Sequence, residues 1–306
     1  MARLRPRWQR VERTIVPRKQ KFNFQKLVDA KKREKKEKHS FLSWLVSPND
    51  QRPCTTVFAS LDVCSVIRDF MRLIRTDKDI RRAVNAWLAR PAAAELVYGP
   101  ISSWDTSRVT DMSSLFETCT EFNADISAWD TRSVKTMRFM FYDAKSFDCD
   151  LRRWNTAQVR TMHGMFCGAR HFNCDLSGWN TARVRDMGRM FDSASSFNGS
   201  LSNWDTGNVR CMYRMFHGAS SFRGGDLRAW NTGKVKIMHQ MFCYASEFNG
   251  DVSTWDTSSV VGMNGMFCHA SSFNCNLNKW NVQNVQNMLC IFSGADSFRT
   301  DLCKWK

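Results

Sequence analysis

The chain has 306 residues and a formal net charge of +16 at neutral pH, a length that suits one large domain or two modest ones. Residues 1–40 hold 15 Lys and Arg against 4 Asp and Glu, whereas residues 101–306 hold 22 against 19. No apolar run approaches the roughly 18 residues of a membrane span, and the basic N-terminus lacks the apolar core of a secretory signal. These features predict an intracellular protein without a membrane span, in which a basic N-terminal extension precedes a near-neutral body.

Residues 1–55 form the basic extension, and the stretch QKLVDAKKREKKEKHS is its most charged part. Such runs are usually solvated, as a charged helix or a flexible tail, but they also direct nuclear import or bind polyanions. Both interpretations stay open. The candidate binding residues of this basic tail are Lys31, Lys32, Arg33, Lys35, Lys36 and Lys38.

Residues 56–100 are predicted to form a helical N-terminal cap. Apolar residues recur at helical spacing in residues 60–75, and again in residues 77–90, where Thr76 and Asp77 suit a helix start. The apolar positions are Leu61, Val63, Ile67, Phe70 and Ile74 in the first segment, and Ile80, Val84, Trp87 and Leu88 in the second. A stack of repeats needs such a cap to keep its first apolar face from water.

Residues 101–306 repeat one pattern eight times. Tryptophan recurs every 25 residues, with one interval of 26 that we attribute to a local bulge at Gly224 and Gly225. The tryptophans are Trp104, Trp129, Trp154, Trp179, Trp204, Trp230, Trp255, Trp280 and Trp305. A fixed period of 20 to 50 residues is typical of solenoids and similar arrays. Positions are counted below from the Trp that opens each repeat.

Each repeat carries the same apolar residues: Val at plus 5, Met at plus 8 and mostly at plus 11, and Phe at plus 12 and plus 18. Spacings of three and four predict a short helix from plus 5 to plus 12, capped by dipeptides such as Asp130-Thr131. Alternation in segments such as DLRRW predicts a strand. Eight strand–turn–helix units stacked in parallel would bury a continuous core, which predicts an α/β repeat solenoid with a parallel β ladder.

Three columns of this repeat have both structural and functional interpretations. The recurring Met and Phe side chains can line a ligand-binding pocket. A solenoid needs the same residues to fill its core, so we favour a packing role. Asn or Asp at plus 19, as at Asn123, is expected to bond backbone groups at a turn. Asp at plus 21, as at Asp125, can bind Ca²⁺ or cap turns. We favour capping, because no Gly-rich metal-binding pattern surrounds this column.

The pattern W-D/N-T-x-x-V-x-x-M-x-x-M-F-x-x-A-x-x-F-N-x-D-L-x-x-W resembles the BspA-type leucine-rich repeat family over about residues 101–306. The lead-in AVNAWLARPAAAELVYGPISSWDTS is similar to the segment that precedes such repeats in algal proteins. The resemblance implies a right-handed leucine-rich-repeat solenoid used for adhesion or protein binding. Members are often secreted or surface-anchored, whereas this chain departs from them in its basic extension.

Function in a stack of repeats is sought along rows that take one residue from each copy. At plus 6, five consecutive copies carry a basic residue: Lys135, Arg160, Arg185, Arg210 and Lys236. This basic row can attract nucleic acid or an acidic protein surface, and Arg183 and Lys234 at plus 4 can extend it. Alternatively, its charges pair with acidic rows, namely Asp130 and Asp205 at plus 1 or Asp111 and Asp186 at plus 7.

Twelve cysteines are present without a C-x-x-C pair, so a zinc site is not expected. Cys149 and Cys174 fall in adjacent repeats, as do Cys243 and Cys268, close enough in principle to form disulfides. In the reducing compartment expected for a chain without a secretory signal, free thiols are favoured.

No catalytic constellation, phosphate-binding loop or dinucleotide motif is found, and no cofactor is expected. The histidines, including His163, His217 and His239, occupy variable positions without a repeated nucleophile or carboxylate. The sequence therefore predicts a non-catalytic repeat scaffold that binds a protein partner through its variable rows, or alternatively a protein associated with nucleic acid. The chain stops at Trp305-Lys306, and this end is expected either to self-associate or to be protected by its terminal charges.

Overall fold

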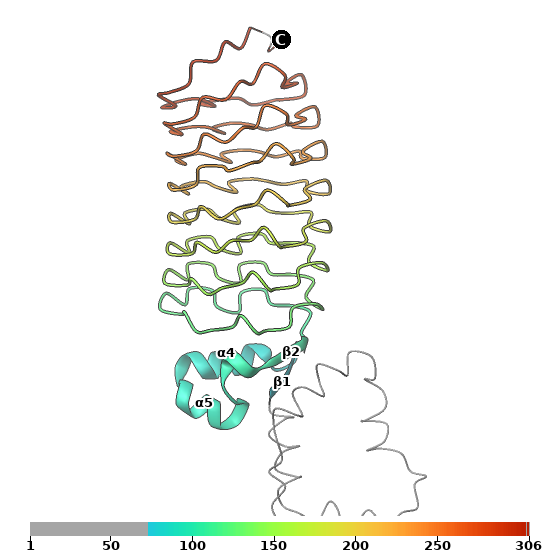
Figure 1. Cartoon of the computed structure of the whole chain (residues 1–306), viewed down its shortest axis with the longest axis vertical. Coiled ribbons are helices and arrows are strands. Elements are labelled where there is room, and N and C mark those ends of the chain that lie inside the picture. The colour runs from blue at the N-terminus through green and yellow to red at the C-terminus, as the bar shows by residue number, and fades with distance from the viewer. Residues whose placement is uncertain (1–72, 304, 306) are drawn as a thin grey trace, which may run out of the picture. The chain divides into compact units, whose positions relative to one another are not determined.

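The structure is a computed structural model that describes residues 73–303 and residue 305, all within one unit that spans residues 61–306. Regular elements occupy only its N-terminal part, and the repeats follow as stacked coils (Figure 1). The elements are strand β1 (Ile74–Thr76), helix α4 (Ile80–Ala89), helix α5 (Pro91–Tyr98), the 3-10 helix η2 (Ile101–Ser103) and strand β2 (Asp105–Arg108). No helix among the described residues is long and apolar enough to cross a membrane.

The segment that precedes the repeats is partly helical, as predicted. Helix α4 falls within the predicted helix at residues 77–90, although it begins at Ile80, and α5 follows after Arg90 with a proline in its first turn. The prediction was wrong at Ile74, which lies in β1 and pairs in parallel with Asp105 of β2. Residues 60–72 of the helix predicted at residues 60–75, and the whole basic tail, lie outside the described residues.

Asp77, just after β1, binds backbone N–H groups at the exposed side of the first coil. Its Oδ1 accepts the backbone N–H groups of Thr110 and Asp111 at 2.7 and 3.0 Å, and its Oδ2 accepts the Thr110 hydroxyl at 2.7 Å. In the next coil, the equivalent N–H of Lys135 donates to the carbonyl of Thr110. The Asp77 carboxylate therefore replaces a carbonyl that a preceding coil would supply, and it satisfies the first backbone donors of the stack.

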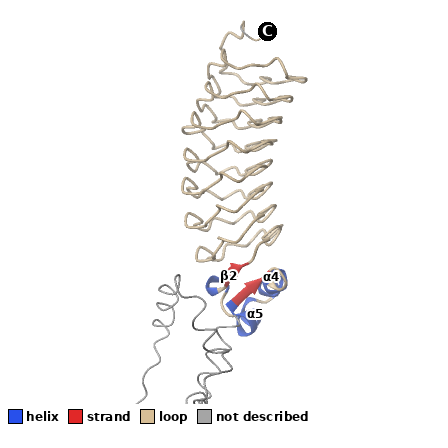
Figure 2. Cartoon of the chain, turned by 90° about the vertical axis from the view of Figure 1, so that its right-hand side faces the viewer, coloured by secondary structure: helices blue, strands red, loops and turns tan. Residues whose placement is uncertain are grey.

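Successive coils lie directly on one another, joined by parallel bridges at plus 7. These bridges link Asp111, Thr136, Thr161, Asp186, Cys211, Ile237, Gly262 and Asn287 in order. Figure 2 shows the coils as loops without long strands, and the helices and strands gathered at the end that bears residues 74–108. The bridges show that the ladder forms at plus 7, so the strand predicted in DLRRW is wrong; that segment forms a turn.

The helix predicted from plus 5 to plus 12 is also absent from the described coils, where this segment forms consecutive turns. Left-handed residues recur at plus 10 and plus 14, for example Arg189 with φ of 56° and Ser193 with φ of 60°. Their N–H groups donate to carbonyls of the next coil, whereas those of Met190 and Asp192 donate within their own coil. A helix would direct all these N–H groups along its own axis. The alternation instead joins each coil to its neighbour.

The core consists of apolar columns that run through the stack, as the repeat predicts. In one coil, Phe141 at plus 12 stacks on Phe147 at plus 18 with ring centroids 3.9 Å apart, and Phe141 stacks on Phe166 of the next coil at 5.6 Å. Val134, Met137 and Met140 of the same coil are fully buried. Aromatic pairs of this kind each contribute about 0.5–1.5 kcal/mol beyond the burial of their area.

Polar columns join the coils at fixed positions. The predicted role of plus 19 is confirmed: the side-chain oxygen of Asn173 accepts the N–H of Asn198 at 2.8 Å, and the Asn173 N–H donates to Asp148 Oδ1 at 3.0 Å. The buried Thr at plus 2 donates to the carbonyl at plus 1 of the next coil, as from Thr181 Oγ1 to Asp205 at 2.9 Å. These bonds fix the register between neighbouring coils.

The interval of 26 residues is accommodated as predicted, by glycines in the left-handed region. Gly224 has φ of +95° and Gly225 has φ of +43°. A Cβ on Gly224 would lie 2.7 Å from the Cα of Gly250 in the next coil. The extra residue therefore needs glycine here, both for backbone conformation and for close approach.

Candidate anion-binding surface

The basic row is continuous along five coils. The backbone N–H of each member donates to the carbonyl of the member before it: Arg160 to Lys135 at 2.8 Å, then Arg185 to Arg160, Arg210 to Arg185 and Lys236 to Arg210, each at 2.9 Å. Neighbouring members therefore sit at the spacing of paired strands, about 4.8 Å. The row spans roughly 19 Å from first to last, by the same spacing.

The five side chains are exposed, and none of them makes an ion pair with a residue between 73 and 303. At plus 4, the Arg183 guanidinium donates to the Gln158 amide oxygen, and Lys234 Nζ donates to Asn208 Oδ1 at 2.9 Å. Amides carry no charge, so these contacts position both cations without neutralising them.

The acidic residues that were candidates to neutralise the basic row have other partners. Asp130 pairs with Arg132, Asp111 with Arg81 at 3.3 Å, and Asp186 with His163 at 3.2 Å. Asp205 accepts the backbone N–H of Gly207. The predicted alternative, pairing of the row with these carboxylates, is therefore not observed, and the row has no counter-charge among the described residues.

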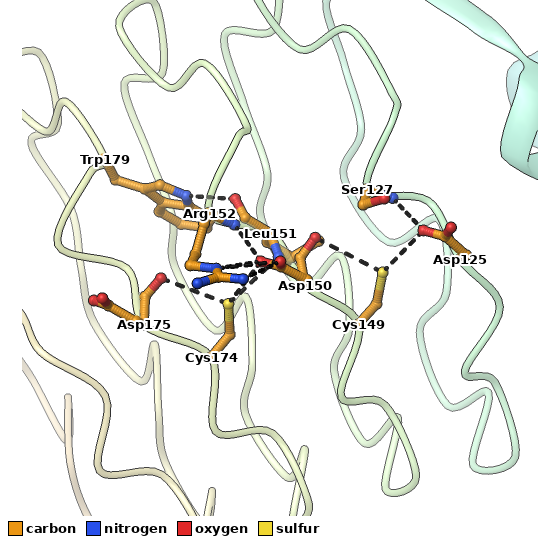
Figure 3. Close-up of polar contacts among 9 residues, drawn as sticks. All are labelled: Asp125, Ser127, Cys149, Asp150, Leu151, Arg152, Cys174, Asp175 and Trp179. Carbon is orange, nitrogen blue, oxygen red and sulfur yellow. Dashed lines mark hydrogen bonds and ion pairs between the residues drawn. The ribbon is translucent and has the colours of Figure 1, made fainter.

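The acidic column at plus 21 caps turns, as Figure 3 shows for two successive coils. Asp125 Oδ1 accepts the N–H of Ser127 at 2.9 Å, and Asp150 Oδ1 accepts that of Arg152 at 3.0 Å. Arg152 also pairs with Asp150 through its side chain at 2.8 Å, which holds the pKa of that carboxyl well below its usual range. Each carboxylate is thus bound to its own turn, and no group of three or more His, Cys, Asp or Glu in the described part of the chain is arranged to hold a metal.

A buried polar cluster, which the sequence analysis missed, lies around Asp192 at plus 13. This carboxylate is 3% exposed and accepts hydrogen bonds from Arg189 Nε at 2.9 Å and Ser193 Oγ at 3.1 Å. Its Oδ1 also lies 3.0 Å from His217 Nδ1. Burial alone would raise the pKa of Asp192, but the bonds from His217 and Arg189 lower it overall. Sequence spacing could not reveal the cluster, because His217 comes from the next repeat and all four members occupy variable positions.

Two histidines make contacts that the sequence analysis did not foresee. No carboxylate recurs beside the histidines from repeat to repeat, but these two have individual partners: His163 meets Asp186 of the next coil and His217 meets Asp192 of the preceding one. A cavity of about 210 Å³ adjoins the Asp192 cluster. It is lined by Tyr142, Asp143, Cys167, Gly168, Arg170, Arg189 and Ser193. Burial raises the pKa of Cys167 to about 12, so this cysteine is a thiol and not a nucleophilic thiolate at neutral pH.

All ten cysteines of the described residues are free thiols. Cys149 and Cys174 each point to the Asp of the preceding coil: Cys149 Sγ lies 3.8 Å from Asp125 Oδ1, and Cys174 Sγ lies 3.7 Å from Asp150 Oδ1 (Figure 3). Burial raises the pKa of both thiols. They are therefore hydrogen-bond donors to the acidic column at neutral pH.

The recurring core columns and the register between coils define a repeat protein. Comparison with protein families places three overlapping matches on residues 90–198, 149–225 and 223–306, to the family described as "Mycoplasma protein of unknown function, DUF285". Since these matches cover well over half of the chain, the protein belongs to that family. Its assignment to the BspA-type leucine-rich repeat family was wrong, because this is not the family whose model matches. Neither the curated proteins nor the solved structures compared with the chain give a match.

Proposed function

We propose that the chain is a non-catalytic scaffold, a solenoid of stacked coils, that binds an anionic partner along the basic row. The observation that carries the proposal is a line of five exposed cations, one from each successive coil, without a counter-charge among the described residues. Their even spacing gives a partner the same contact five times. The right-handed sense of the solenoid stays a prediction.

Two classes of partner fit such a row. An acidic protein surface would bind by charge complementarity at the rim of an interface whose centre is apolar. Nucleic acid would bind through its phosphates, and each phosphate contact would release a counter-ion. The tail residues Lys31 to Lys38 would add attraction in either case. We place the protein partner first, because the row is one residue wide and the neighbouring rows vary from coil to coil in a way that suits a specific surface.

The test is binding by the full chain, measured by fluorescence anisotropy with labelled single-stranded RNA, duplex DNA and an acidic peptide across a salt series. The main variant replaces the row: Lys135→Gln, Arg160→Gln, Arg185→Gln, Arg210→Gln and Lys236→Gln. The control, which removes one charge fewer, replaces four exposed arginines that do have carboxylate partners: Arg132→Gln, Arg152→Gln, Arg223→Gln and Arg228→Gln.

Loss of binding in the row variant, with retention in the control variant, supports the proposal. For nucleic acid, the logarithm of affinity should fall with the logarithm of salt with a slope of about 4 to 5 if all five cations contact phosphates of a duplex. A shallow slope with the acidic peptide favours a protein partner. Equal losses in both variants would show that net charge matters and the row does not.

A further inference from the structure

Two pairs of cysteines occupy the same position in adjacent coils: Cys149 and Cys174 at plus 20, and Cys243 and Cys268 at plus 13. Both pairs are separated by 25 residues, so the loop that a disulfide would close has the same length in each. Sequence spacing therefore cannot distinguish them. The orientation of the side chains can.

The thiols of the first pair are engaged with other groups. Cys149 Sγ accepts the N–H of Ile126 at 3.5 Å and faces Asp125, whereas Cys174 Sγ accepts the N–H of Leu151 at 3.4 Å. Figure 3 shows each sulfur turned toward the carboxylate of the preceding coil. Neither thiol bonds to the other, and each would have to leave two partners to form a disulfide.

The thiols of the second pair have no hydrogen-bond partner of this kind among residues 73–303, and the pKa of Cys243 is raised by burial and then by the neighbouring Cys268. Their backbones are equivalent: the N–H of Cys243 donates to Gln240 and that of Cys268 to Gly265, three residues earlier in each coil. The N–H of Tyr244 donates to the carbonyl of Cys268 at 2.8 Å, which places the two cysteines side by side in register. The Cα separation of paired strands, about 4.8 Å, falls within the range of disulfides.

We propose that Cys243 and Cys268 form a thiol–disulfide exchange site that takes up a low-molecular-weight disulfide and closes to a covalent link between adjacent coils. The Cys268 thiolate attacks one sulfur of the small disulfide, forms a mixed disulfide and expels one thiolate, which takes up a proton. The Cys243 thiol then loses its proton to solvent and attacks the Cys268 sulfur, and the second small thiol leaves. Two protein thiols are oxidised, and one small disulfide is reduced to two thiols.

The order of the two steps follows from exposure. Cys268 is half-buried, whereas Cys243 is 3% exposed, so the small disulfide reaches Cys268 first. Burial and the neighbouring Cys268 raise the pKa of Cys243 to about 12. Its thiolate is therefore rare at neutral pH, and closure of the protein disulfide is the slower step.

The experiment incubates the reduced full chain with oxidised glutathione at low protein concentration, quenches it with acid and alkylates the free thiols. Mass spectrometry of a non-reduced digest then identifies the linked peptides. We expect a peptide that joins Cys243 to Cys268, and no peptide that joins Cys149 to Cys174. Cys268→Ser should abolish the link, and Cys243→Ser should stop the reaction at the mixed disulfide on Cys268.

The double variant Cys149→Ser/Cys174→Ser is the matched control and should form the link at the rate of the unmodified sequence. Circular dichroism of each variant checks that the coils still stack. A mixed disulfide on Cys268 that never closes in the unmodified chain would refute the proposal. Equal yields of the two possible links would also refute it, because they would show that spacing and not side-chain orientation controls exchange.

Discussion

Replacing Arg185 by Gln is expected to stabilise the fold while it weakens binding of an anionic partner. Arg185 is the central member of the basic row, and its backbone bonds place it between Arg160 and Arg210. Its side chain has no ion pair among residues 73–303. A cation that only repels its neighbours in the folded state lowers the free energy of unfolding, so its removal should raise it.

The magnitude follows from the spacing of the coils. Two unit charges about 4.8 Å apart repel by about 0.9 kcal/mol in water. Mobile ions at 0.15 M reduce this by about half. Arg185 has two such neighbours, and long side chains can splay apart, so the expected gain is at most about 1 kcal/mol at that ionic strength.

Urea denaturation followed by circular dichroism measures the change, at low salt and again at 0.5 M NaCl. The gain should shrink in high salt, because screening removes the repulsion that the substitution relieves. Arg152→Gln is the control: Arg152 pairs with Asp150, so its removal should not stabilise the protein. A loss of stability for Arg185→Gln at low salt would refute the reasoning, since it would reveal a partner for this side chain within the fold.

Three further predictions concern the stack itself. Thr181→Val should lower the free energy of unfolding in urea by about 1–3 kcal/mol, because the carbonyl of Asp205 loses a buried donor; an unchanged midpoint would refute the role of this column. Phe191→Ala should cost about 3–5 kcal/mol, since it opens a cavity in the aromatic core; a smaller loss would show that the coils close over the gap. Burial opposes ionisation of Asp77, but its bonds from Thr110 lower its pKa overall, so its stabilisation is present above the unfolded pKa of about 4 and is lost as pH falls through the lower folded value. Asp77→Asn should therefore be less stable at neutral pH, and its melting temperature should depend less on pH in a series of melts between pH 6 and 2. A pH dependence parallel to that of the unmodified chain would contradict this.

The apolar columns could be predicted from sequence because they depend on burial alone. Val134, Met137 and Phe141 are fully buried, whichever backbone carries them. The role of Asn173 was also predictable, because a side-chain amide that recurs at one position per repeat can serve the backbone only if the repeats stack in register. Such inferences use the period of the sequence and need no knowledge of the local conformation.

The local conformation itself was predicted wrongly, and the cause is physical. Apolar spacings of three and four suit a helix, but they also suit consecutive turns in which the residues at plus 10 and plus 14 are left-handed. Arg214 and Tyr244 adopt φ of 51° and 59° although neither is glycine, and nothing in their side chains indicates it. The bond that each coil supplies, such as from the N–H of Tyr244 to the carbonyl of Cys268, stabilises a conformation that an isolated segment would avoid.

Because the repeats stack in register, each surface position of the repeat forms a line of residues along the stack. The acidic column at plus 21 and the basic row at plus 6 are two such lines, and they differ in whether contacts within the fold explain them. Asp125 and Asp150 at plus 21 each accept the N–H of a residue two positions on, so their removal would leave a turn without its cap. Lys135 and Arg210 at plus 6 contribute only their backbones to the ladder, and their side chains meet no counter-charge among the described residues. Folding therefore explains the acidic line and leaves the basic line unexplained. A line of like charges lowers the stability of the free protein, and it is also what a site for an anionic partner requires. Measuring the free energy of unfolding and the binding affinity of Arg185→Gln therefore tests whether one side chain both destabilises the fold and binds the partner.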